Sequence, residues 1–212
     1  MILKNIIGHF NTVNRHRWEV FKLSVHAGIP LRGLLHDLSK YSPTEFLESA
    51  KYYQGGKRSP IPAARDDKGY SIAWLHHKGR NKHHFEYWYD AKQIEIPVLP
   101  KKYAIELICD MLAAGFVYKG KDWTKEFEIE YWNKVEPETM ANDKMKKFCR
   151  EVYTEISKDG INKVITKKNL NMLYDKYCKW NDWDGSETIG TVLIVSPMIK
   201  VKRLGGSKFI IY

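Results

Sequence analysis

A long amphipathic segment near the start of the chain most constrains the fold. Apolar residues in segment 3–28 recur at three- and four-residue spacing, which is the repeat of one face of an α-helix. They are Ile6, Ile7, Phe10, Val13, Trp18, Phe21, Leu23 and Val25. Gly28 and Pro30 favour an end to this helix, because glycine suits a C-cap and proline cannot continue a helix. A chain of 212 residues that are 43% hydrophobic is long enough for one well-buried core.

Further helices are predicted along most of the chain. Ser42 followed by Pro43 and Glu45 is typical of a helix start, and this helix is expected to end near residue 53. A loop is expected over 54–69, where glycine, proline and charged residues dominate. The other predicted helices cover 3–28, 31–38, 71–78, 83–91, 101–117, 122–133, 137–159 and 163–180.

The pattern changes near Asp184 and Gly185. Short apolar runs over 191–195, 199–202 and 209–212 predict β-strands, separated by Pro197 and a Gly-Gly pair. We therefore expect a mainly α fold, with a helical domain over residues 1–184 and a short β appendage over 185–212 that packs on it. The strand edges suit either a partner or dimer contact or the covering of the domain's own core.

Charge and cysteine content indicate the setting in which the chain works. The formal net charge is +10, and basic residues are concentrated over 51–82. A positive field there attracts phosphates or nucleic acid, although a basic surface also serves solubility alone.

Cys109, Cys149 and Cys178 form no CxxC pair, which is typical of free thiols in a reducing compartment. Since no apolar run reaches ~18–20 residues and the N-terminus carries no signal sequence, we expect no membrane span and a cytoplasmic location.

Histidines and aspartates in the first half of the chain have the character of a metal site. Of the eight histidines, seven lie between His16 and His84. His16 lies on the first predicted helix, His36 and Asp37 near the end of a short one, and Asp110 within an apolar one. Neighbouring residues of a helix point about 100° apart, so an HD pair can face one metal only at a helix end or in a shared groove. Because a buried aspartate needs a partner or a metal, these residues predict a divalent-metal site.

The order H…HD…D on successive helices resembles that of the HD-domain superfamily of metal-dependent phosphohydrolases. The stretches HDLSKYSPTEF and AWLHHKGRNKHHFEYW are more closely similar to an uncharacterised HD-like family of bacterial and phage proteins, over roughly residues 10–135. The resemblance implies an HD-like helical bundle, a metal held by His16, His36, Asp37 and Asp110, and phosphate esters, often of nucleotides, as substrates. Superfamily members with two metals use further histidines between the HD pair and the last aspartate.

Four histidines are candidates for the second metal: His76, His77, His83 and His84. If 71–84 were one helix, the first and third would share a face, and so would the second and fourth. A break within the Gly-Arg-Asn sequence would instead place the two pairs around a turn. We expect His77 and His83 to be ligands and at least one of the four to serve the structure.

Roles for the neighbouring residues follow if the substrate is a phosphate ester. Asp37 is expected both to bind metal and to orient the attacking water, and Lys40 to neutralise phosphate charge. Lys78, Arg80 and Lys82 are the expected substrate-binding residues, although each is also explained as an ordinary solvated side chain.

The expected function is that of a metal-dependent phosphohydrolase or phosphodiesterase acting on a nucleotide or related phosphate ester. It would use one or two divalent ions of Mn, Fe, Co, Ni or Mg. One alternative is a non-catalytic HD-like module that binds nucleotide or nucleic acid through its basic loop, and another is a metal-free helical interaction protein. The complete H…HD…D set favours turnover. The sequence leaves the substrate, the metal and the oligomeric state open.

Overall fold

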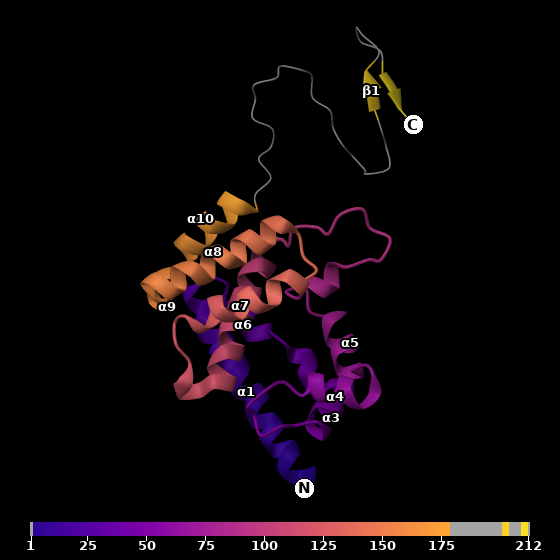
Figure 1. Ribbon diagram of the computed structural model, residues 1–212, viewed down its shortest axis with the longest axis vertical. Helices are drawn as coiled ribbons and strands as arrows, with labels where there is room; N and C mark the ends of the chain where they lie inside the picture. The colour runs from indigo at the N-terminus through magenta and orange to yellow at the C-terminus, as the bar shows by residue number, and fades with distance from the viewer. Residues whose placement is uncertain (1, 179–200, 204–208, 212) are drawn as a thin grey trace. The chain divides into compact units, whose positions relative to one another are not determined.

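The computed structural model describes residues 2–178, 201–203 and 209–211. The chain divides into two compact units, Met1–Lys179 and Trp180–Tyr212 (Figure 1). The described part of the first unit is helical, which confirms the expected mainly α fold. Its α-helices are α1 (Ile2–His26), α2 (Pro30–Leu35), α3 (Pro43–Lys51), α4 (Ile61–Lys68), α5 (Ile72–Lys78), α6 (Lys101–Lys119), α7 (Phe127–Val135), α8 (Asp143–Asp159), α9 (Ile161–Val164) and α10 (Lys167–Tyr177). Short 3₁₀ turns are η1 (Leu38–Tyr41), η2 (Phe85–Trp88), η3 (Gly120–Asp122) and η4 (Glu136–Glu138).

The described residues of the second unit form an antiparallel strand pair. β1 (Val201–Arg203) pairs with β2 (Phe209–Ile211), with Lys202 opposite Ile210. The strand predicted over 191–195 lies outside the described residues. That this segment packs on the helical domain, and that the boundary falls at 184–185, stay predictions.

Helix α6 forms the centre of the helical unit. It is apolar on almost every side, as expected of a helix enclosed by others, and Ile108 and Leu112 are fully buried. α1 and α2 pack against it, and so do α7 and α10, while α8 packs against α7 and α10 (Figure 1). Burial of this apolar core is the main source of stability.

Helices α3 and α5 hold one side of the candidate site. α3 packs against both α1 and α5. As predicted, Ser42 caps α3, where its Oγ accepts the backbone N–H of Glu45 at 3.4 Å. Ser71 caps α5 in the same way, accepting the N–H of Trp74 at 3.1 Å. The caps fix where both helices begin, and hence which of their side chains meet.

The chain leaves its helix at His36 and Asp37. α2 ends at Leu35, and Asp37 has a φ of 52°, the one positive φ among the described non-glycine residues. Arg17 of α1 holds this turn, because its Nε donates to the His36 carbonyl and its Nη2 to the Leu34 carbonyl, both at 2.8 Å. Carbonyls at a helix end lack partners within the helix, so this arginine satisfies them.

Several predicted elements differ from the observed ones. α4 lies within the segment predicted as a loop over 54–69, because proline is tolerated in the first turn of a helix and Gly69 ends it with a φ of 78°. The helix predicted over 83–91 is the shorter turn η2 followed by extended backbone at Tyr89. The helix predicted over 163–180 is divided into α9 and α10 by Thr166, which caps α10.

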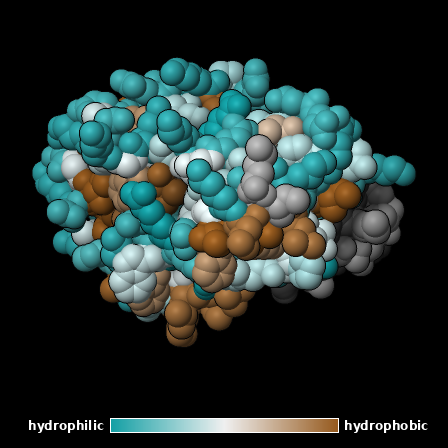
Figure 2. All heavy atoms as spheres, turned by 90° about the horizontal axis from the view of Figure 1, so that it is seen from below, coloured by the Kyte–Doolittle hydropathy of each residue, from teal (hydrophilic) through white to brown (hydrophobic). Residues whose placement is uncertain are grey.

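The surface of the described residues is mostly hydrophilic, with apolar patches. Figure 2 shows these patches among hydrophilic side chains on one face. Exposed apolar residues on α1 and α2 include Trp18, Leu31 and Leu34. No helix among the described residues has the length and apolarity needed to cross a bilayer.

The three cysteines are buried free thiols, as predicted.

Candidate metal centre

The first ligand set joins three parts of the fold. His16 comes from α1, His36 and Asp37 from the turn after α2, and Asp110 from α6. One nitrogen or oxygen from each of these residues lies within 4.8 Å of those of the others. His16 Nε2 lies 2.9 Å from Asp110 Oδ1, and His36 Nε2 lies 3.2 Å from Asp37 Oδ2. Two imidazoles and two carboxylates therefore converge on one small volume.

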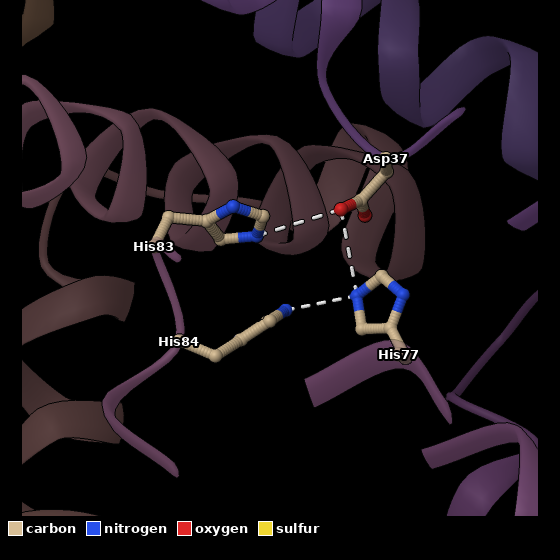
Figure 3. Close-up of side chains that lie close together, drawn as sticks. All are labelled: Asp37, His77, His83 and His84. Atoms are coloured by element: carbon tan, nitrogen blue, oxygen red, sulfur yellow. Dashed lines mark hydrogen bonds and ion pairs between the residues drawn. The ribbon is translucent and has the colours of Figure 1, made fainter. Parts of the chain in front are cut away.

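The second ligand set shares Asp37 with the first. Its other members are His77 on α5 and the consecutive pair His83 and His84 before η2, and the four ligand atoms again lie within 4.8 Å of one another (Figure 3). Asp37 Oδ1 lies 3.4 Å from His77 Nε2 and 3.5 Å from His83 Nε2. Oδ2 of the same carboxylate faces the first set, so Asp37 offers one oxygen to each set.

Buried polar atoms at this centre lack hydrogen-bond partners. Among the described residues they include Nε2 of His16, Nε2 of His36, both carboxylate oxygens of Asp37 and both ring nitrogens of His83. Some of these atoms nonetheless lie close to an opposite charge: Asp37 Oδ2 is 2.5 Å from Lys40 Nζ, and His16 Nε2 is 2.9 Å from Asp110 Oδ1. An unsatisfied buried polar group costs about 1–3 kcal/mol, and a bound ligand would remove this cost for many of these atoms at once. Lone pairs that converge from several directions fit a divalent metal.

Glu106 orients two of the imidazoles from behind. It lies one helical turn before Asp110 on α6, so both carboxylates point from the same face. Its Oε1 lies 3.1 Å from His36 Nδ1 and 3.5 Å from His83 Nδ1, while Arg32 Nε donates to its Oε2 at 2.8 Å. A carboxylate that accepts one ring N–H of a histidine leaves the other nitrogen free to bind metal.

Glu45 has the same relation to the second set. Its Oε2 lies 2.7 Å from His77 Nδ1, and its Oε1 lies 2.6 Å from His76 Nδ1. In sequence this glutamate appears only as a helix-start residue, but its side chain reaches across to α5. It thereby turns His77 Nε2 toward Asp37 and keeps His76 outside both ligand sets.

The carboxylates of the centre stay ionised and draw positive charge. Burial opposes ionisation of Asp37, but the charges of His36, His77 and Lys40 hold its pKa well below the usual range. Burial also opposes protonation of His36, yet Asp37 and Asp110 raise its pKa well above the usual value. The negative charge of these carboxylates is therefore stabilised by cationic partners at the centre.

Other imidazoles at the centre favour the neutral form. Burial and the charge of Lys40 lower the pKa of His16, despite its contact with Asp110. Burial and the charges of His83 and His77 hold the pKa of His84 well below the usual value. Neutral rings have a free lone pair, which is the form that binds metal.

A cavity of about 130 Å³ adjoins both ligand sets. His16, His77 and His84 line it on the side of the ligands. Its other walls come from α1, α3 and α5, from the segment before α4, and from Tyr118 at the end of α6. Two cationic side chains, Lys40 and Arg58, line it. The cavity therefore offers room for a small chemical group next to the candidate metal ligands.

The structure brings together all six residues predicted as metal ligands: His16, His36, Asp37, Asp110, His77 and His83. Lys40 belongs to the same centre, with its Nζ 2.5 Å from Asp37 Oδ2.

The predicted substrate-binding residues Lys78, Arg80 and Lys82 are not among the described residues that line the cavity. Arg80 and Lys82 are exposed, and Lys82 lies over the rings of Tyr87 and Tyr103.

Sequence reasoning missed four contributors. Glu106 carried a usable signal, because a position four residues before Asp110 on one helix shares its face. Glu45 and Arg58 carried none, since their roles depend on how α3 and the segment before α4 pack. His84 was one of four candidate histidines, and only the turn between α5 and η2 distinguishes it from His76.

Comparison with known proteins identifies a family. The sequence model of a family described as "Family of unknown function (DUF5662)" matches residues 5–155. No curated protein and no solved structure matches the chain. The matched region runs from α1 into α8 and contains every residue of both ligand sets.

Proposed function

The chain belongs to the DUF5662 family of unknown function, and we propose that this member is an HD-type, metal-dependent phosphohydrolase or phosphodiesterase. Its substrate is a nucleotide or a related phosphate ester. The observation that carries the proposal is the Asp37 carboxylate, which is shared by two sets of buried ligands beside a cavity with cationic side chains. With divalent ions bound, such a centre would suit hydrolysis of a phosphate ester, because paired ions can stabilise the attacking and the leaving oxygens.

The chemistry of the donors supports two divalent ions. Both sets combine imidazole nitrogens with carboxylate oxygens, and the second is rich in imidazole. Imidazole suits Fe²⁺, Co²⁺ or Ni²⁺, while the carboxylates keep Mn²⁺ and Mg²⁺ within the range of candidates. Bound by these residues, a divalent ion would supply polarisation of a phosphoryl oxygen and an acidified water.

In this scheme the protein's own residues orient the attacking water, balance the charge of the phosphate and hold the ligand imidazoles in place. Asp37 stands between the two sets and, from there, orients the attacking water. Lys40 contacts Asp37 and lines the cavity, so its ammonium neutralises charge on a bound phosphate. Glu106 and Glu45 keep the ligand imidazoles in the required tautomer.

A module that binds a nucleotide or nucleic acid without turnover is the second candidate. The cations at the cavity would serve it equally well. It does not, however, explain why ring nitrogens and carboxylate oxygens are buried without hydrogen-bond partners. Those atoms favour the metal-dependent enzyme.

Metal analysis and a substrate screen test the proposal. The purified protein is examined for bound transition metals, loaded with Mn²⁺, and assayed against nucleoside mono-, di- and cyclic phosphates. Asp37→Asn keeps the shape of the side chain but removes a charged ligand shared by both sets. We expect its kcat/KM to fall by more than about 100-fold, because even loss of an outer partner of a metal ligand typically costs 10–100-fold.

Asp66→Asn is the matched control, since Asp66 is an exposed aspartate on α4 outside both ligand sets. Its activity should equal that of the wild type. The enzyme proposal fails if the protein binds no divalent metal, or if Asp37→Asn hydrolyses the substrates as fast as the wild type does.

A further inference from the structure

Among the described residues that line the cavity beside the ligand sets, one cation has no anionic partner. Apart from histidines, its charged lining residues are Lys40, Glu45 and Arg58. Lys40 pairs with Asp37, and Glu45 contacts the two histidines of α5. Arg58 has no ion pair with a carboxylate among the described residues. Its Nε donates instead to Oε1 of Gln54, a neutral amide.

The guanidinium of Arg58 therefore keeps donors for a ligand. An arginine has five N–H donors, and the contact with Gln54 occupies the one on Nε. The remaining groups lie on the terminal nitrogens, which form the planar fork that binds phosphate oxygens in pairs. The residue is exposed while also lining the cavity, which places it at the mouth, where a substrate enters.

The segment that carries Arg58 is held against the cavity wall. Ser59 Oγ accepts the backbone N–H of Ile61 at 3.3 Å, at the start of α4. Arg65 of α4 lies over the ring of Trp74, with 5.7 Å from its Cζ to the ring centroid, and Trp74 itself lines the cavity. These contacts hold the start of α4 beside the cavity, and the segment that carries Arg58 leads directly into it.

The rest of the cavity fits an organic group rather than a second anion. His9 is neutral at physiological pH, because burial and the charge of Lys40 lower its pKa to about 4. Tyr53 and Trp74 add aromatic surface, and Thr12 lies 3.3 Å from the Tyr53 hydroxyl. Positive charge is thus found near the ligand sets, at Lys40, and at the mouth, at Arg58.

We propose that Arg58 is a substrate-binding residue of this site, in addition to Lys40, and that it binds anionic oxygens of a phosphate-containing substrate at the cavity mouth. This inference rests on the proposed function for the identity of the substrate. It assigns to Arg58 the role that sequence reasoning gave to Lys78, Arg80 and Lys82, none of which lines the cavity.

Binding of inorganic phosphate to the full-length, Mn²⁺-loaded protein tests the inference without requiring turnover. Isothermal titration compares the wild type with Arg58→Gln, Arg58→Lys and two controls, Lys57→Gln and Arg80→Gln. Both control residues are exposed cations outside the cavity lining. We expect Arg58→Gln to weaken phosphate binding about 10–100-fold, the usual effect of losing a hydrogen bond to a charged group, while Arg58→Lys recovers part of it. Mn²⁺ affinity and melting temperature should be unchanged in every variant.

The outcomes separate this inference from the proposed function. If Arg58→Gln alone weakens phosphate binding, but the wild type hydrolyses no substrate, Arg58 keeps its role and the enzyme proposal falls. If Arg58→Gln binds phosphate as the wild type does, or Arg80→Gln is the variant that loses binding, the role of Arg58 is refuted. A wild-type protein that binds no phosphate refutes it as well.

Discussion

Asp37 concentrates the chemistry of the centre in one side chain. Its left-handed backbone, with a φ of 52°, is uncommon for a residue with a Cβ, although aspartate adopts it more readily than most. Strained backbone of this kind is retained where the surrounding structure determines it, often at functional sites. Here Arg17 holds the turn in this conformation, because it donates hydrogen bonds to the carbonyls of His36 and Leu34. The result is one carboxylate with an oxygen for each ligand set.

The partner carboxylate Glu106 gives a first prediction. Glu106→Gln removes the charge that orients His36 and His83 without changing the size of the side chain. We expect Mn²⁺ affinity to fall about 10–100-fold, as for other outer partners of metal-ligating histidines. Titration calorimetry with Mn²⁺ measures this, and Glu86→Gln, at an exposed position, is the control. Equal Mn²⁺ affinity in Glu106→Gln and wild type would contradict the orienting role.

A second prediction concerns Glu128, a buried carboxyl outside both ligand sets. Burial raises its pKa to about 7, although Trp123 Nε1 donates to it at 2.9 Å. The unfolded chain loses this proton near its ordinary pKa of about 4.3, while the folded chain keeps it up to a higher pH. The folded state therefore binds more protons in this window, and the free energy of unfolding falls as pH rises from about 4.5 to 7.

Glu128→Gln should remove that part of the pH dependence. At pH 8 we expect the variant to have a free energy of unfolding roughly 2–3 kcal/mol above that of the wild type, with little difference at pH 4.5. Urea denaturation at the two pH values measures both quantities. Glu126→Gln, on an exposed neighbour, should behave as the wild type. Parallel pH profiles for Glu128→Gln and wild type would show that Glu128 ionises normally in the folded protein.

At the scale of elements, the close packing of α1 and α2 places the HD turn. α2 ends immediately before His36, so any shift of this helix moves both ligands. The helices approach closely at Gly33, because a Cβ there would overlap the side chain of Ser24 and lie 3.1 Å from Cα of Phe21. Glycine at this position therefore allows the two helices to touch.

Gly33→Ala tests this packing. We expect the free energy of unfolding to fall by about 1–3 kcal/mol, the usual effect of overpacking, and Mn²⁺ affinity to fall with it. The control is Gly79→Ala, because a Cβ at Gly79 meets nothing closer than 3.4 Å and its φ of −73° suits alanine. Chemical denaturation and Mn²⁺ titration report both effects. If both variants have wild-type stability, α2 tolerates displacement and the packing argument is wrong.

At the scale of the whole molecule, one helical unit carries everything that the proposed chemistry needs. Both ligand sets, the cavity and the core around α6 lie within Met1–Lys179. The unit also includes the whole region that matches the family, residues 5–155. Since a domain with its own core can fold alone, this unit should not depend on the residues that follow it.

Expression of residues 1–179 alone tests this independence. We expect a helical circular-dichroism spectrum, a cooperative thermal transition and the Mn²⁺ affinity of the full chain. Mn²⁺ at about 100 times its dissociation constant should raise the free energy of unfolding by about 2.7 kcal/mol per site in both proteins. An unfolded fragment, or one that binds Mn²⁺ more weakly than the full chain, would show that residues 180–212 contribute to the domain.

The sequence by itself determined the class of fold and the types of residue that meet at the candidate site. Helical periodicity, the cap at Ser42 and the end of the first helix are set by near neighbours along the chain, so they can be read from local pattern. The ligand types follow from the side chains themselves, and the six predicted ligands do meet. The segments that were misassigned, α4 and η2, are short. α4 follows a stretch of proline, glycine and charge, and η2 is a single 3₁₀ turn, so local preference is weak in both.

Only the tertiary structure decided how these residues combine. That Asp37 is shared between two sets, that Glu45 and Glu106 orient the imidazoles, and that Arg58 lines the cavity all depend on side chains from separate helices. Glu106 and His36, for example, are 70 positions apart in the chain. Contacts at such separations are set by how helices pack around a core, and no local pattern of residues encodes that packing.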